Sequence, residues 1–152
     1  MNLERSILVA FIGNYLINNV VAALVALIPP STTPDSVFTA QYVAYVILAA
    51  IFAAGFAWWA LKTVARSRAM NAGILFGVIA FVVSIVTAFV TGVTGVLAQT
   101  GSLSQMFAII PNFGPFLWSW STLVLLGYWV IPAVIVGVML QRQAASSPSE
   151  SM

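Results

Sequence analysis

The stretch SILVAFIGNYLINNVVAALVALI, residues 6–28, decides the fold class of this protein. It carries no charged residue. A helix needs about 20 predominantly apolar residues to cross the hydrocarbon core of a bilayer. The stretch is also longer than the roughly 7–15 apolar residues of a signal peptide. We therefore expect a retained transmembrane helix over 6–28.

Three further apolar segments of similar length follow, at 41–61, 72–98 and 116–140. The expected fold is an all-α integral membrane protein, a four-transmembrane-helix up-down bundle that forms one domain over residues 1–143. Residues 102–110 are expected to form either a short interfacial helix or a plain loop. The polar tail 144–152 is expected to be disordered.

Local signals mark the expected helix ends. Asn2 can cap the first helix, and Pro29-Pro30 should stop it. Pro34 suits the first turn of the second helix. Residues 99–101 (QTG) should end the third helix, and residues 111–115 (PNFGP) should interrupt the chain before the fourth.

Composition restricts the function classes. The chain is 62% hydrophobic and 5% charged, whereas soluble domains carry roughly 25% charged residues. It contains no Cys and no His, and its acidic residues Glu4, Asp35 and Glu150 are far apart in the sequence. The usual catalytic dyads and triads therefore cannot be built. We expect no catalysis, no cofactor and no metal site. Five cations are too few and too scattered for nucleic-acid binding.

The cations predict an orientation. The links 29–40 and 99–115 contain no Lys or Arg. Positive residues collect on the cytoplasmic side of membrane proteins, so both termini are expected in the cytoplasm (N-in/C-in), in a bacterial cytoplasmic membrane. The cations flank the termini or lie in the link between the second and third helices: Arg5, Lys62, Arg66, Arg68 and Arg142.

Four polar side chains, Asn14, Tyr15, Asn18 and Asn19, interrupt the first segment. At 100° per residue, with Asn14 at zero, Asn18 lies at about 40°, Tyr15 at about 100° and Asn19 at about 140°. They form one face near the bilayer midplane, which either bonds to another helix or lines a solute site. The opposite side is expected to face lipid and contains Val9, Leu16, Ile17, Val20, Leu24 and Leu27.

The third segment carries a row of small residues spaced alternately by four and three. Such a row lets another helix approach closely, although its hydroxyls also permit a pore lining. We call this row the small-residue seam; it consists of Gly73, Gly77, Ala80, Ser84, Thr87, Thr91, Thr94 and Ala98.

Pro132 should kink the fourth helix and free the Tyr128 carbonyl. That carbonyl, the Tyr128 hydroxyl and the Trp129 indole lie at a depth where they can join the Asn face.

The sequence favours a non-catalytic membrane protein that acts as a helix-packing or interaction subunit of a homo-oligomer or larger assembly. Its expected partners are the lipid bilayer and other transmembrane helices, from itself or from another protein. The alternative is an oligomeric channel, facilitator or permease component for a small neutral solute, which would use the Asn face of the first helix.

Overall fold

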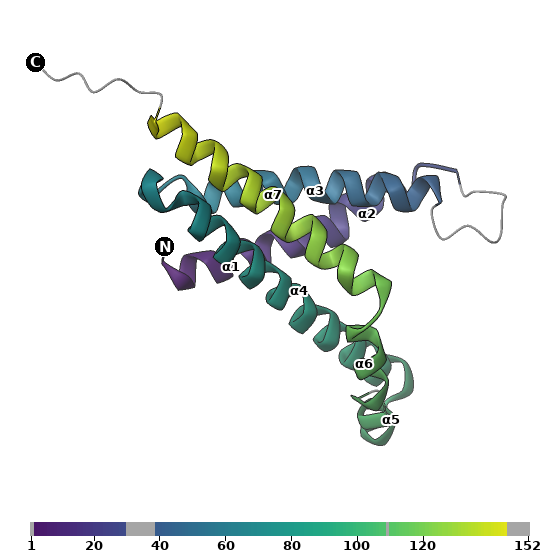
Figure 1. Cartoon of the computed structure of the whole chain (residues 1–152). Coiled ribbons are helices and arrows are strands. Elements are labelled where there is room, and N and C mark those ends of the chain that lie inside the picture. Colours follow the sequence, from purple (N-terminus) through teal and green to yellow (C-terminus); the bar gives the residue numbers. More distant parts are fainter. Residues whose placement is uncertain (1, 30–38, 109, 146–152) are drawn as a thin grey trace, which may run out of the picture.

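The computed structural model describes residues 2–29, 39–108 and 110–145, and every regular element within these ranges is a helix. Four helical segments are long and apolar enough to cross a membrane, as predicted (Figure 1). They are α1 (Leu3–Leu16) continued by the π-helix η1 (Ile17–Val21) and α2 (Ala22–Val25), then α3 (Ala40–Leu61), α4 (Ala69–Thr100) and α7 (Trp120–Ala145). A single 3-10 turn, η2 (Arg66–Arg68), precedes α4.

Helix ends follow their local signals. The Asn2 side chain accepts hydrogen bonds from the backbone N–H groups of Glu4 and Arg5, at 3.0 and 3.4 Å, as expected of a cap. Gly101 ends α4 with φ of 63°, a left-handed conformation that glycine adopts without strain. Its N–H donates to the Leu97 carbonyl at 2.8 Å.

The second long helix has its own N-terminal cap. Thr39 caps α3 by accepting a hydrogen bond from the Tyr42 N–H at 3.1 Å. Pro34 lies outside the described residues, and so do residues 146–152 of the expected tail. Residues 144 and 145 belong to the last turn of α7.

The interruption expected over residues 111–115 is a helix instead. Residues 103–108 form α5 (Leu103–Ala108), and Pro111 to Pro115 lie within α6 (Ile110–Leu117). Pro111 lies in the first turn of this helix, where its missing N–H needs no partner, whereas Pro115 lies inside it. The break falls later, at the turn of Trp118 and Ser119. As a result α7 begins at Trp120 and not at residue 116.

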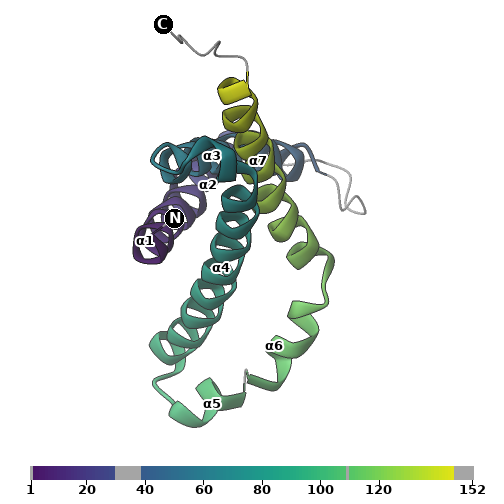
Figure 2. The same cartoon turned by 60° about the vertical axis from the view of Figure 1, so that its left-hand side comes forward.

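Close contact between α4 and α7 organises one half of the molecule. A side-chain carbon at Gly77 would lie 2.8 Å from the Val130 Cα, and one at Gly137 would lie 2.7 Å from the Ala69 carbonyl oxygen. The two helices then diverge toward α5 and α6, which join their far ends (Figure 2). We call residues 69–84 the near half of α4 and residues 85–100 its far half.

The start of α1, the end of α7 and the link between α3 and α4 lie on one side of the molecule (Figure 1). There the Arg5 guanidinium donates to the Thr63 hydroxyl at 2.8 Å and to the Trp59 carbonyl at 3.0 Å. The Lys62 ammonium lies 5.9 Å from the centre of the Trp58 ring. The N-terminal end of α1 is thus tied to the end of α3.

Candidate functional site

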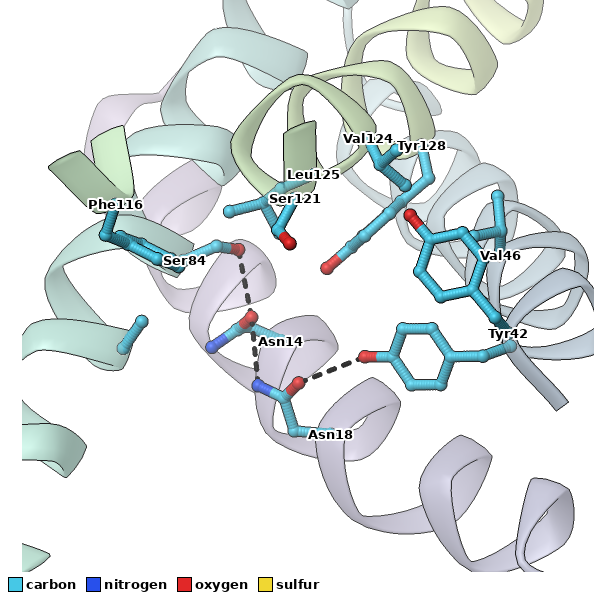
Figure 3. Close-up of a pocket in the computed structure, with 12 residues that line it drawn as sticks. Asn14, Asn18, Tyr42, Val46, Ser84, Phe116, Ser121, Val124, Leu125 and Tyr128 are labelled. Carbon is cyan, nitrogen blue, oxygen red and sulfur yellow. Dashed lines mark hydrogen bonds between the residues drawn. The ribbon is translucent and has the colours of Figure 1, made fainter. Parts of the chain in front are cut away.

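Polar side chains from all four of the long helical segments meet around a cavity of about 210 Å³ (Figure 3). We call it the Asn14 cavity. Its walls come from α1 and η1, α3, α4, α6 and α7. The lining residues are Asn14, Asn18, Tyr42, Tyr45, Val46, Ser84, Ala88, Phe116, Ser121, Val124, Leu125 and Tyr128.

A chain of hydrogen bonds crosses one wall of this cavity. The oxygen of the Asn14 amide accepts from the Ser84 hydroxyl at 2.9 Å and from the Asn18 amide at 3.3 Å. The oxygen of the Asn18 amide accepts from the Tyr45 hydroxyl at 3.2 Å. Side chains of α4, α1, η1 and α3 are therefore linked at one point (Figure 3).

The Asn14 amide retains an unused hydrogen-bonding atom. Asn14 is only 2% exposed, and its buried Nδ2 has no hydrogen-bond partner among the described residues. The Ser84 hydroxyl has one proton but lies 2.9 Å from both the Asn14 oxygen and the Ala80 carbonyl. A rotated Asn14 amide would turn its nitrogen toward the Asn18 amide nitrogen, which lies 3.3 Å from the Asn14 oxygen, so two donors would face each other. The Asn14 oxygen therefore keeps its contacts with Ser84 and Asn18, and the open Nδ2 costs about 1–3 kcal/mol.

Gly13 explains why Asn14 is buried at this crossing. A side-chain carbon at Gly13 would lie 2.9 Å from the Phe56 ring and 3.0 Å from the Trp129 ring. Only the absence of a side chain lets α1 approach α3 and α7 this closely. The glycine therefore places the next residue, Asn14, among three other helices.

The π-helix carries the next two amides. Ile17–Val21 forms a single π turn, a feature often found at functional sites. Within it the Asn18 amide faces Asn14, while the Asn19 amide turns away and donates to the Tyr15 carbonyl at 2.7 Å. The polar face expected from the helical wheel is thus divided between two directions.

The structure places all five residues predicted for the polar face at cavities. Asn14, Asn18 and Tyr128 line the Asn14 cavity. Tyr15 and Asn19 line a second cavity of about 520 Å³ between the first helix and α4, which also includes Asn18, Thr87, Ala88 and Thr91.

The prediction of which residues of the first helix face lipid is partly wrong. Val20, Leu24 and Leu27 are exposed, but Val9 and Ile17 are buried in the core. The buried arc is centred beside Gly13, where other helices come closest, so it lies off the centre of the polar arc. Asn14 lies at the edge that the two arcs share.

The small-residue seam divides in two. Gly73, Gly77, Ala80 and Ser84, in the near half of α4, are buried. In the far half Thr91, Thr94 and Ala98 are exposed, and Thr87 is half-buried. The Thr87 and Thr94 hydroxyls donate to carbonyls of their own helix at 2.8 Å. The part of the seam in the near half of α4 is therefore packed within the chain, and the part in the far half is not.

Tyr42, Tyr45 and Ser121 were not predicted as site residues. The two tyrosines are three residues apart, a spacing that puts both on one face of a helix and gives the only sequence signal for them. Ser121 carries no comparable signal. Trp129 of the fourth helix was also expected to join the polar face. Its ring instead packs against that of Phe76, with 6.4 Å between the two ring centres.

None of the described residues that line the Asn14 cavity is charged. Its amides and hydroxyls can donate and accept hydrogen bonds but provide neither a base nor a charge partner. The arrangement is suited to binding an uncharged polar group. No protein-family model, curated protein or solved structure matches this chain.

Proposed function

We propose that this chain is a non-catalytic multi-pass membrane protein that binds a small uncharged molecule in the Asn14 cavity. The observation that carries the proposal is the Asn14 amide, which is almost fully buried, accepts bonds from Ser84 and Asn18, and keeps an unused donor. A ligand atom that accepts a hydrogen bond would remove the cost of that unused donor. Binding would make the protein a component of a channel, facilitator or permease assembly.

The depth of the site supports this proposal. Asn14 is the central residue of the span Leu3–Val25, and Ser84 is next to the centre of Arg66–Thr100. Polar side chains at that depth often mark solute pathways. Most of the lining from α7 lies in the part of that helix nearer to α5 and α6, so the cavity extends from the midplane toward that half of the bundle.

The orientation is proposed from the cations. Arg5 contacts the link that contains Lys62, Arg66 and Arg68. The positive-inside rule then favours an up-down bundle with both termini in the cytoplasm, in the cytoplasmic membrane of a bacterium. We call the half that contains α5 and α6 the outer half. Reporter insertions at Ser67 should be cytoplasmic and those at Ser102 external; a cytoplasmic signal from Ser102 contradicts this orientation.

A second candidate function is that of an interaction subunit within the membrane. It is favoured by the far half of α4, where Thr91, Thr94 and Ala98 are small and exposed. Small residues allow another helix to approach closely. The two functions are compatible, because a permeation pathway built from four helices encloses little space without further subunits.

Ligand-induced stabilisation tests the leading proposal. Small amides and polyols should raise the melting temperature of the purified protein in a concentration-dependent way, whereas Na⁺ and acetate should not. Asn14→Leu should abolish this shift, and Thr91→Leu, on the far half of α4, should retain it. The proposal is wrong if no uncharged solute stabilises the protein, or if Asn14→Leu responds as the native chain does.

A further inference from the structure

An apolar groove lies directly beside the Asn14 cavity. It has a volume of about 270 Å³ and opens between α3 and α7. Tyr42, Val46 and Val124 line both the groove and the cavity. The two spaces therefore lie at the same depth, separated by no more than these shared side chains.

The groove faces the surroundings of the protein and not its core. Val43, Ile47 and Trp120 complete its lining, and all three are exposed. In a membrane this surface contacts lipid chains. Branched aliphatic side chains and an indole form a surface that a hydrocarbon chain can pack against by dispersion forces.

The adjoining cavity provides the polar part of the binding site. The hydroxyls of Ser121 and Tyr128 point into the same space as the Asn18 amide (Figure 3). The unused atom of Asn14 belongs to the same wall. Within the described part of the chain, the residues that line the cavity and the groove are all uncharged. An ionised head group would be buried there without a counter-charge, which is strongly unfavourable.

We propose that the occupant is a single-chain amphiphile that enters sideways from the outer half of the bilayer. Its uncharged hydroxyl-bearing head occupies the Asn14 cavity, and its hydrocarbon chain leaves through the groove between α3 and α7. A monoacylglycerol or a long-chain alcohol has this chemistry. The inference rests on the proposed function and adds the chain and the direction of entry.

A photoreactive lipid tests the path of the chain. The full-length protein is reconstituted in liposomes with a monoacylglycerol that carries a diazirine in its acyl chain. After irradiation, cross-linked peptides should map to residues 43–47 and 120–124. Unlabelled monoacylglycerol should compete for this labelling, and a fatty acid of equal chain length with an ionised carboxylate should not.

Two variants of α3 provide the matched control. Ile47 lines the groove and is 55% exposed, whereas Ile51, one helical turn away and 61% exposed, lines none of the cavities described above. Both positions tolerate a larger side chain because they face outward. Ile47→Trp should reduce the competed labelling by about tenfold because it fills the groove, and Ile51→Trp should leave it unchanged.

Three results overturn the inference: equal labelling of the Ile47→Trp and Ile51→Trp variants, labelling spread over all lipid-facing helices, or equal competition by the fatty acid. If small polyols stabilise the protein through Asn14 while the lipid does not label the groove, the proposed function stands and the amphiphile is wrong. If neither ligand acts, both are wrong.

Discussion

The two halves of α4 carry the same pattern of small residues, yet only one half is packed. In the near half, Gly73 and Gly77 meet the backbone of α7 at Ala133 and Val130. In the far half, a side-chain carbon at Gly92 or Gly95 would meet no atom of the described residues within 4 Å. Small residues permit a close helix contact, but the contact forms only where the opposing helix is also suitable.

The opposing residues explain the difference. Opposite the near half, α7 presents Ala133 and Gly137, which let the two backbones approach. In the far half of α4, the Phe113 ring of α6 lies 4.8 Å from that of Phe89 and 5.2 Å from that of Phe116. Aromatic rings thus make a contact between α4 and α6 there, in place of the small residues of the near half. The Asn14 cavity lies on the side of α4 that faces α1 and α3. It is at the level where the near half of α4 ends and the far half begins.

A glycine pair gives the largest expected effect. Gly77→Leu should destabilise the protein by roughly 1–3 kcal/mol, because the new side chain meets the Val130 backbone. Gly92→Leu, on the same helix but in open space, should not lower stability. Thermal unfolding in mild detergent measures both variants. Equal destabilisation would show that the far half is packed as tightly as the near half.

Removing one hydroxyl from each half of α4 should have an intermediate effect on stability. Ser84→Ala removes the bond between α4 and Asn14 and should cost about 1 kcal/mol. Thr94→Val removes a hydroxyl that bonds within its own helix, so a change within about 0.5 kcal/mol is expected. Chemical or thermal denaturation of the two variants should therefore differ. A Thr94→Val loss as large as that of Ser84→Ala contradicts the division of the seam.

The smallest effect should have the opposite sign. Gly95→Ala adds a methyl group in open space and improves helix propensity, which is worth at most about 1 kcal/mol. A slight rise in melting temperature is expected. A fall would mean that another helix packs against Gly95, in the same chain or in an assembly, and would favour the interaction-subunit function.

Much of the fold could be predicted because its causes are local. Apolar length identified the four long helices, and single residues such as Asn2 and Gly101 marked their ends. The helix at residues 111–115, where an interruption was expected, was less predictable. A proline near the start of a helix and a proline in a loop look the same in sequence.

The site was harder to predict because it depends on how helices cross. The helical wheel grouped Asn14 with Asn18, which line one cavity, but it placed Val9 and Ile17 in lipid although both are buried. The wheel assumed that the polar arc is the buried arc. Burial is in fact decided by the close approach at Gly13, and that approach depends on Phe56 and Trp129, far away in the sequence.

Cysteine labelling tests the central claim that the Asn14 cavity admits polar molecules at membrane depth. The native chain has no cysteine, so single thiols can be placed without background. N-ethylmaleimide is uncharged and reacts with the thiolate, which forms only where the thiol meets water. Asn18→Cys and Ser121→Cys line the cavity, whereas Ile51→Cys and Val82→Cys face outward on α3 and α4. The account predicts rapid labelling of the first pair and protection of the second. Equal protection of all four thiols would contradict it and leave the polar residues as helix-packing contacts only.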